Sequence, residues 1–460
     1  MKTLLTAAAF AALLAGAGPS FAQQSAAVAG QWDAVLSRDG TEIPFRLDIT
    51  GDGPTLQGVF YDGFKPYDGT TSASFKDGKL VLTVQHYNTT ISATLADGKL
   101  TGVLDGHNRE TNSHYSFRAA RHVDAAASAA GGPSIAGTWV IPLATPSSKG
   151  EKAFRLIVQQ QGGETAASIL RIDGDTGAYS GGFKDGRWVL SHFDGGRPGV
   201  IVVTPKADGT LEIRQRVERP GTETAAQAGA NAGDYKTAND YAASSAPDGR
   251  YAPALIAYRQ EVAKAKGLPE PDDFLSHTTA RDPNETFAFN FPDASGKLIS
   301  NEDPRFKGKV VLAIVTGTWC PNCHDEAQYL VELDKKYRDK GLAIVALDFE
   351  EPAQQGGLER AKAFVKKYGV NYTYLFAGAP EEMWEKVPQL NHLDTWPATV
   401  FVGRDGKVKA VHSGFASPAA GEFHAQLERE FTTRIEQLLA ENAAAKVAAA
   451  TPTAATPRSN

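Results

Sequence analysis

The chain has 460 residues, a formal net charge of −6, 42% hydrophobic residues and 22% charged residues of both signs. A chain of this length exceeds a single hydrophobic core, so it predicts two to four domains. The interspersed charges form no basic surface of the kind that binds nucleic acid, and we expect no nucleic-acid partner.

Residues 1–22 have the pattern of a secretory signal peptide. Lys2 precedes an apolar run, and Ser20 and Ala22 supply small residues at the expected cleavage positions. We therefore expect export to an oxidising compartment, the bacterial periplasm, with Gln23 as the first mature residue. No later run reaches the roughly 18 apolar residues that a membrane span requires, so the exported protein is expected to be soluble.

Residues 27–122 consist of short alternating runs separated by turn signals, a pattern typical of antiparallel β-structure. Asp-Gly pairs at 39–40, 77–78 and 97–98 fit hairpin turns that need positive φ. Residues 134–220 repeat this plan after an Ala/Gly-rich link at 124–133. The repeated segments are 30–32 with 137–139, 45–47 with 154–156, and 75–82 with 183–190. The near-constant offset predicts an internal duplication of a small β-barrel or sandwich module.

The function of the two β modules is only weakly encoded. Four histidines of the first module could be considered metal ligands: His86, His107, His114 and His122. Scattered histidines in strands are more often surface residues, and we expect that here. A docking surface for a partner, or self-association of the chain, is the favoured use of the modules.

Residues 221–284 are predicted to form a linker that contains one short helix. The stretch 220–250 is rich in Ala, Gly, Ser, Asn and Thr. A helix is predicted over 253–266, with an apolar stripe of Leu255, Tyr258 and Val262.

Residues 285–441 alternate between strand and helix patterns, which predicts an α/β domain with a parallel or mixed sheet. Strands are expected at 310–316, 342–349, 372–376, 398–402 and 408–412, and helices at 321–339, 357–368 and 417–440. The Ala/Thr/Pro-rich residues 442–460 are expected to form a disordered tail. The predicted fold class is therefore multidomain, with two duplicated antiparallel β modules followed by one α/β domain.

The only two cysteines of the chain, Cys320 and Cys323, lie where a buried strand passes into a helix. The loop that they could close is too small to stabilise the fold, so the thiols are expected to serve chemistry. Unpaired N–H groups and the helix dipole favour an anion such as a thiolate at this position. We therefore predict a redox-active disulfide, with Cys320 as a nucleophile of lowered pKa and Cys323 as its resolving partner.

From about 285 to 440 the sequence resembles the TlpA/ResA family of thioredoxin-fold thiol–disulfide oxidoreductases. The matching residues are Phe306-Lys307-Gly308-Lys309-Val310-Val311, Thr318-Trp319-Cys320-Pro321-Asn322-Cys323, Glu326, Trp396-Pro397-Ala398-Thr399-Val400-Phe401-Val402, Asp405-Gly406-Lys407 and His412-Ser413-Gly414-Phe415. The resemblance implies a thioredoxin fold, protein disulfide substrates and a membrane thiol electron donor. It favours the reductase direction, as in cytochrome c maturation or other metalloprotein assembly. We expect no cofactor and no metal.

The resemblance also assigns roles to single residues. Pro397 corresponds to the cis-proline opposite the cysteines, which leaves the backbone of Trp396 free to pair with an extended substrate segment. Glu326, one turn after Cys323, corresponds to an acid that assists proton transfer at the buried second thiol. Trp319 is expected to pack over the motif and to contribute to substrate binding.

Three alternatives stay open. Cys320-Pro321-Asn322-Cys323-His324 satisfies the C-x-x-C-H signal for c-type haem, although Met383 is the only downstream methionine that could be a distal ligand. A peroxiredoxin-like peroxidase would want a Thr three residues before its reactive cysteine, where Cys320 has Gly317. A non-enzymatic module binding copper(I) or a partner would usually add further Met or Cys ligands. In the favoured interpretation, His324 is an exposed residue of the first helical turn.

Overall fold

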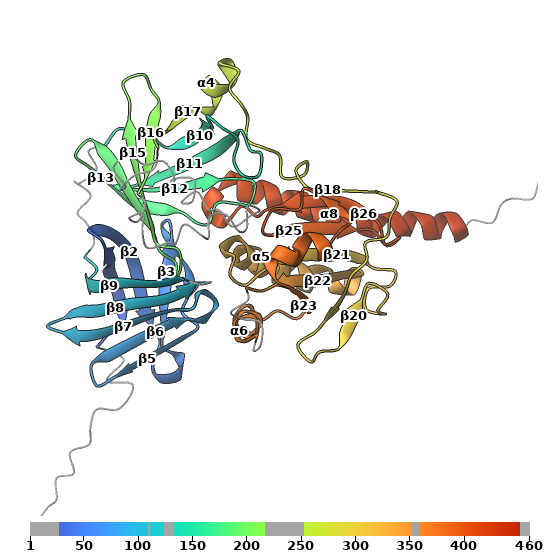
Figure 1. Ribbon diagram of the computed structural model, residues 1–460, viewed down its shortest axis with the longest axis horizontal. Coiled ribbons are helices and arrows are strands. Elements are labelled where there is room, and N and C mark those ends of the chain that lie inside the picture. The colour runs from blue at the N-terminus through green and yellow to red at the C-terminus, as the bar shows by residue number, and fades with distance from the viewer. Residues whose placement is uncertain (1–26, 109–110, 124–131, 217–252, 352–357, 451–460) are drawn as a thin grey trace, which may run out of the picture.

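The structure is a computed structural model that describes residues 27–108, 111–123, 132–216, 253–351 and 358–450. It contains a nine-stranded sheet, a closed eight-stranded barrel and a five-stranded sheet with helices, as Figure 1 shows. The expected signal peptide at 1–22, the linker stretch 220–250 and most of the link at 124–133 lie outside the described residues. Within the described part of the chain, no helix is both long and apolar enough to cross a membrane.

The first β unit is an antiparallel meander in which each strand pairs with the next, except β4 with β5. Its strands are β1 (Gly30–Arg38), β2 (Thr41–Thr50), β3 (Gln57–Asp62), β4 (Lys65–Gly69), β5 (Ser72–Lys76), β6 (Lys79–Val84), β7 (Thr89–Ala96), β8 (Lys99–Asn108) and β9 (Thr111–Arg121). Because β1 also pairs with β9, the sheet runs from β4 through β1 and β9 to β5. Asp39, Asp77 and Asp97 have φ values of 49°, 51° and 49°, as the predicted Asp-Gly hairpin turns require.

The second β unit is a closed antiparallel barrel. Its strands are β10 (Gly137–Pro142), β11 (Ala153–Gln161), β12 (Glu164–Leu170), β13 (Tyr179–Lys184), β14 (Arg187–His192), β15 (Gly199–Pro205), β16 (Leu211–Gln215) and β17 (Leu255–Arg259). β17 pairs with both β16 and β10, and so it closes the barrel.

The helix predicted over 253–266 is wrong in its first half. Residues 255–259 form β17, and only Gln260–Ala265 are helical, as α4. Without β17 the edges of β10 and β16 would keep unpaired N–H and C=O groups, which favours a strand here over the local helical pattern. Ala257 of β17 is fully buried in the barrel core.

Each β unit has the same contact between its first strand and its last. The Trp32 indole N–H donates to the carbonyl oxygen four residues earlier (2.8 Å), and the Arg121 guanidinium lies 4.0 Å from the ring of Trp32. In the barrel, Trp139 donates to the carbonyl oxygen four residues earlier (2.9 Å), and Arg259 lies 4.0 Å from its ring. The units differ in closure, because the nine-stranded sheet stays open between β4 and β5.

The two β units share a hydrophobic core. Phe193, in the loop that follows β14, is 2% exposed and belongs to the core of the first unit. Its ring centroid lies 4.7 Å from that of Phe45 and 5.4 Å from that of Phe60. The β units are therefore packed against each other through a loop of the barrel.

The C-terminal α/β domain is built on a mixed sheet with the order β23-β22-β21-β25-β26. Its strands are β21 (Val310–Thr316), β22 (Leu342–Phe349), β23 (Thr373–Gly378), β25 (Ala398–Val402) and β26 (Val408–Ser413). β21, β22 and β23 are parallel, whereas β25 and β26 are antiparallel to their neighbours. Two short antiparallel pairs complete the domain: β18 (Thr279–Ala280) with the distant β24 (Leu390–Asn391), and the hairpin of β19 (Asn290–Pro292) and β20 (Leu298–Ser300).

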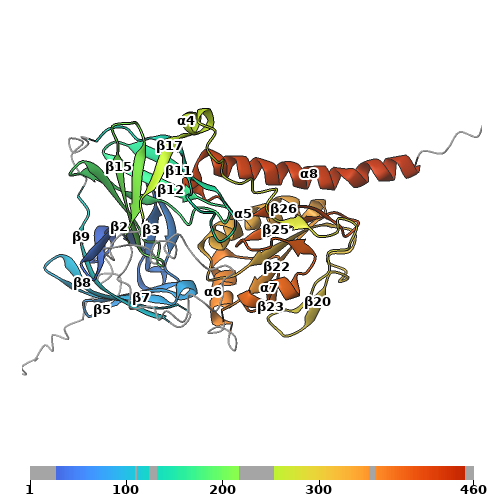
Figure 2. The same cartoon turned by 45° about the horizontal axis from the view of Figure 1, so that its top comes forward.

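Helices cover this sheet. They are α5 (Pro321–Tyr337), α6 (Glu359–Tyr368), α7 (Met383–Lys386) and α8 (Glu422–Ala450). α8 packs Leu427, Phe431 and Ile435 against the sheet, and its C-terminal turns extend beyond the domain in Figure 2. The prediction of a disordered tail from 442 is wrong up to Ala450, because this Ala-rich stretch has high helix propensity and continues α8. Residues 451–460 lie outside the described residues.

Candidate active site

The two cysteines lie at the N-terminal end of α5, directly after the central strand. All seven residues of β21 are buried. Cys320 is the N-cap of α5, Pro321 takes its first position, and Cys323 lies in its first turn. The Cys323 N–H donates to the Cys320 carbonyl oxygen (3.2 Å). Cys320 is 3% exposed and Cys323 is 1% exposed, so both residues are nearly enclosed.

A cis-proline lies opposite the dithiol. The Trp396–Pro397 peptide bond is cis. The Cys320 thiol donates to the carbonyl oxygen of Trp396, with 3.4 Å between Sγ and the oxygen. The rings of Trp319 and Trp396 pack edge to face at 5.0 Å. The structure thus brings together Cys320 and all three residues that the resemblance assigns to substrate binding.

The surroundings of Cys323 disfavour its thiolate form. Burial and the neighbouring Cys320 raise the pKa of Cys323 well above its ordinary value, while hydrogen bonds with Thr316 and Gly317 oppose this shift. A buried thiol of this kind releases its proton only with the help of a base.

Glu326 lies on α5 one turn after Cys323 and is 1% exposed. Its Oε1 accepts a hydrogen bond from the Thr399 hydroxyl on β25, and Oε2 has no partner among the described residues. Burial raises the pKa of Glu326 to about 8, and the Thr399 hydrogen bond only partly offsets this. A carboxyl group with this pKa exchanges its proton near neutral pH, as a general acid or base must.

A second pair of buried acids was missed by the sequence reasoning. Asp348 is the register partner of Thr316 on the neighbouring strand, and Glu350 follows two residues later. The Glu350 Oε1 accepts from the Thr318 N–H (2.8 Å), so it supports the turn that leads to Cys320. Burial raises the pKa of both carboxyl groups; the neighbouring Glu350 raises the pKa of Asp348 further, whereas hydrogen bonds with Thr318 and Asp348 and the charge of Arg360 partly offset the shift of Glu350. The signal in the sequence was the acidic cluster at the C-terminal end of a buried strand.

The expectation that His324 is exposed is wrong. His324 is 2% exposed, and burial lowers the pKa of its ring to about 3. Its ring nitrogens lie 2.8 Å from the Tyr368 hydroxyl and 2.7 Å from the Thr318 carbonyl oxygen. His86 of the first β unit, which was expected at the surface, is fully buried against it, with 4.3 Å between the ring centroids. The contact between the first β unit and the α/β domain brings the two rings together, and Phe364 and Tyr368 of α6 also pack on His324.

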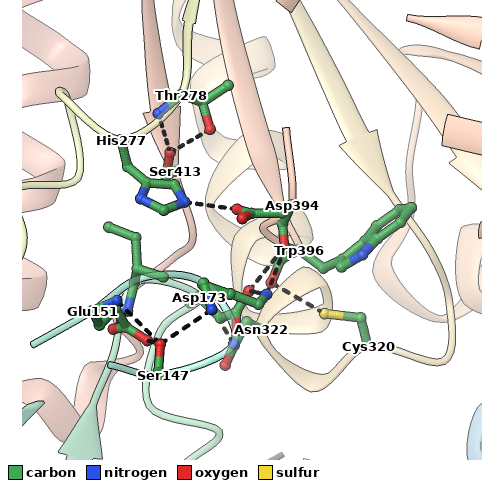
Figure 3. Close-up of polar contacts among 12 residues, drawn as sticks. Ser147, Glu151, Asp173, His277, Thr278, Cys320, Asn322, Asp394, Trp396 and Ser413 are labelled. Atoms are coloured by element: carbon green, nitrogen blue, oxygen red, sulfur yellow. Dashed lines mark hydrogen bonds and ion pairs between the residues drawn. The ribbon is translucent and has the colours of Figure 1, made fainter. Parts of the chain in front are cut away.

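The β units cover the face of the α/β domain that carries the dithiol. On α6, Lys367 forms an ion pair with Asp68 of β4 (2.6 Å). From the barrel, Arg197 donates to the Trp319 carbonyl oxygen (3.4 Å), and Asp173 accepts from the Trp396 N–H (3.1 Å). Figure 3 shows Asp173 and Cys320 approaching Trp396 together.

His107, His114 and His122 remain scattered on the first β unit. Each is hydrogen-bonded to a different residue, respectively Asn112, Asp105 and Asp33. In the described part of the chain, no three His, Cys, Asp or Glu side chains gather in a geometry that could hold a metal ion.

A dithiol at a helix N-terminus, opposite a cis-proline and on this mixed sheet, defines a thioredoxin-like domain. Residues 279–427 match the family model described as Redoxin. Over 120 residues the chain is 32% identical to "Thiol-disulfide oxidoreductase ResA" of Bacillus anthracis, covering 26% of this chain and 62% of that protein. It is 29% identical over 126 residues to ResA of Bacillus subtilis (strain 168), covering 27% of this chain and 64% of that protein.

The chain therefore spans less than two thirds of the length of these ResA proteins. Among solved structures, it resembles a "putative Thiol:disulfide interchange protein DsbE" from Chlorobium tepidum, with 20% identity and a TM-score of 0.27, covering 34% of this chain and 98% of that one. The C-terminal part of the chain contains a Redoxin domain similar to the ResA proteins, and the resemblance to the TlpA/ResA family is confirmed for this domain.

Proposed function

We propose that the C-terminal domain is a thiol–disulfide oxidoreductase in which Cys320 and Cys323 form the redox-active pair. The observation that carries this proposal is the position of Cys320 Sγ, 3.4 Å from the Trp396 carbonyl oxygen and next to cis-Pro397. A substrate disulfide whose flanking backbone pairs with Trp396 would be presented to this sulfur. The similarity to ResA proteins supports the same chemistry.

The exchange has two steps. The Cys320 thiolate attacks one sulfur of the substrate disulfide, so a mixed disulfide forms, the substrate S–S bond breaks and the released thiolate takes up a proton. Cys323 then loses its proton with the help of Glu326 and attacks the Cys320 sulfur. The substrate leaves as a dithiol, and the two electrons that it gained come from the pair that becomes the Cys320–Cys323 disulfide. The raised pKa values of Cys323 and Glu326 support this assignment. They place a thiol that holds its proton tightly and a carboxylate that is a stronger base than usual on the same helix.

We further propose that the direction is reduction, in the periplasm, with a membrane thiol donor that restores the dithiol. The support is the signal-peptide pattern of residues 1–22 and the family resemblance. The direction depends on the reduction potential of the pair, for which about 30 mV corresponds to about 1.4 kcal/mol.

The two β units are inferred to descend from one duplicated module. The repeated segments and the equivalent Trp–Arg contacts in the two units support this origin. Their different closure then reflects divergence after duplication. Self-association through these units is a further proposal, and light scattering over a range of protein concentrations tests it.

The haem alternative has weaker support. Both ring nitrogens of His324 have hydrogen-bond partners inside the protein, Tyr368 and Thr318. Axial ligation of iron would require this ring to leave its buried position. An absorption spectrum of the purified protein without a Soret band is the expected result.

Turnover of insulin, a protein disulfide, by the single variants tests the proposal. Cys320→Ser is expected to abolish exchange, whereas Cys323→Ser should accumulate a mixed disulfide through Cys320. The double variant sets the background rate. An active Cys320→Ser protein would end the proposed mechanism.

A further inference from the structure

The loop of residues 171–177, between β12 and β13 of the barrel, lies directly on the dithiol site. We call it the covering loop. The Asp173 carbonyl oxygen accepts from the Phe415 N–H and from the Asn322 side-chain amide, each at 2.9 Å. The Asn322 side-chain oxygen accepts from the Thr176 N–H (2.9 Å). Asn322 lies between the two cysteines, so the covering loop binds the motif itself.

The covering loop also binds the backbone N–H of Trp396, with which the proposed function pairs the substrate. The Asp173 carboxylate accepts the Trp396 N–H at 3.1 Å, while the Cys320 thiol donates to the Trp396 carbonyl oxygen at 3.4 Å. An extended substrate segment that pairs with Trp396 needs these same two groups. Both are satisfied from within the chain, so a substrate has to displace Asp173.

The closeness of this contact depends on a glycine. Gly174 has a φ of +122° and forms a parallel bridge with Phe415. A Cβ atom at Gly174 would lie 2.0 Å from the Phe415 carbonyl oxygen and 2.8 Å from Cγ of Asn322. Any larger residue would therefore push the covering loop away from the site.

A buried cation fixes the position of Asp173. The Lys149 ammonium group donates to the Asp173 carboxylate and to the Asp394 carbonyl oxygen, each at 2.5 Å. Its side chain is only 5% exposed. Lys149 and Asp173 belong to the barrel and Asp394 to the α/β domain, so this ion pair also joins the two domains. Charge-assisted contacts of this kind are stronger than neutral ones.

We propose that the covering loop is an intramolecular pseudosubstrate that keeps the dithiol closed. If the domain is the proposed oxidoreductase, on which this inference rests, a protein disulfide reaches Cys320 only when the covering loop leaves Trp396. The apparent affinity for substrate then falls in proportion to the fraction of molecules that are open. An extended segment of a partner protein that offers a carbonyl oxygen to the Trp396 N–H is the ligand that competes with Asp173.

Two pairs of matched variants of the full chain test the closure. Gly174→Ala places a Cβ against Phe415, whereas Gly186→Ala, in the turn after β13, has a φ of +79° and no atom within 4 Å of its Cβ. Asp173→Asn removes the charge that binds Lys149. Asp185→Asn removes an exposed charge from the same turn as Gly186, at a positive φ that Asn tolerates.

The first measurement is the rate at which iodoacetamide alkylates Cys320 in the reduced native protein. Gly174→Ala and Asp173→Asn should react about tenfold faster or more, the factor that loss of one charge-assisted hydrogen bond typically represents, and both controls should match the parent chain. If Gly174→Ala does not fold, Asp173→Asn and its control decide alone. Equal rates in all folded variants would overturn the proposal.

The second measurement is insulin reduction by the same variants with excess dithiothreitol, and it separates the two proposals. Faster turnover by the two loop variants supports closure. Faster alkylation without exchange in any variant would keep the closure and refute the oxidoreductase. Exchange by the parent chain with unchanged alkylation in the loop variants would refute the closure alone.

Discussion

Replacing Glu326 with Gln is expected to slow disulfide exchange and to remove a pH dependence of stability. Glu326 is buried, and its pKa is raised to about 8 from an ordinary value of 4.5. Between about pH 4.5 and 8 the folded protein therefore keeps a proton that the unfolded chain has already released. In this window stability falls as pH rises, because the unfolded state binds fewer protons than the folded state. Gln carries no titratable proton and lacks this effect.

The magnitude follows from the shift. One group that holds a proton in the folded state alone costs about 1.4 kcal/mol of stability for each pH unit inside the window. The free energy of unfolding of Glu326→Gln, relative to that of the parent chain, should therefore rise by about 1.4 kcal/mol per pH unit between pH 5 and 8, whatever the difference between the two proteins at pH 5. Above pH 8 Glu326 has lost its proton in both the folded and the unfolded parent chain, and the difference in stability between parent and variant should level off.

Urea unfolding of the reduced proteins at several pH values between 5 and 9 measures this difference. The matched control is Glu332→Gln, an exposed glutamate on the same helix, which should follow the parent chain at every pH. Stopped-flow exchange with insulin, in parallel, should show a slower second step for Glu326→Gln, without the rise in rate toward pH 8. Parallel stability profiles for Glu326→Gln and the parent would refute the assignment of a raised pKa to Glu326.

Three further substitutions test the packing. Phe193→Ala should destabilise the joined β units by roughly 3–5 kcal/mol, since it empties a core position, and a shift in urea midpoint equal to that of a surface variant would contradict this. Arg360→Ala should cost roughly 3–5 kcal/mol because it leaves the Glu351 carboxylate buried without its ion-pair partner at 3.0 Å, whereas the exposed Lys362→Ala should cost little. Asp348→Asn should cost less stability at higher pH than at lower pH, because burial raises the pKa of Asp348 well above its ordinary value and the parent chain therefore loses stability as pH rises; a difference in melting temperature that does not change with pH would count against that.

The α/β domain was the part of the fold that the sequence predicted best. The predicted strands 310–316, 342–349 and 398–402 agree with β21, β22 and β25 at both ends, because continuous apolar runs with turn residues at each end leave little ambiguity. The position of the cis-proline beside Cys320 also followed from sequence, through the resemblance.

What the sequence did not predict depends on contacts between distant segments. β17 is a five-residue strand whose local pattern is helical, and it becomes a strand because the barrel needs an eighth partner. His86 and His324 are polar residues far apart in the sequence, and their rings meet where the first β unit packs on α5 and α6. Asp173 looks like an ordinary loop acid, and its contact with Trp396 spans more than two hundred residues.

The account depends most on reversible two-electron chemistry at Cys320 and Cys323. Equilibration of the full chain in glutathione buffers of graded potential, followed by acid quenching and mass spectrometry, measures it directly. The expected result is a single reversible transition with loss of two hydrogens, mapped to a Cys320–Cys323 disulfide, at a potential below that of the glutathione pool. Thiols that stay reduced in every buffer, or that form only glutathione adducts, would contradict it.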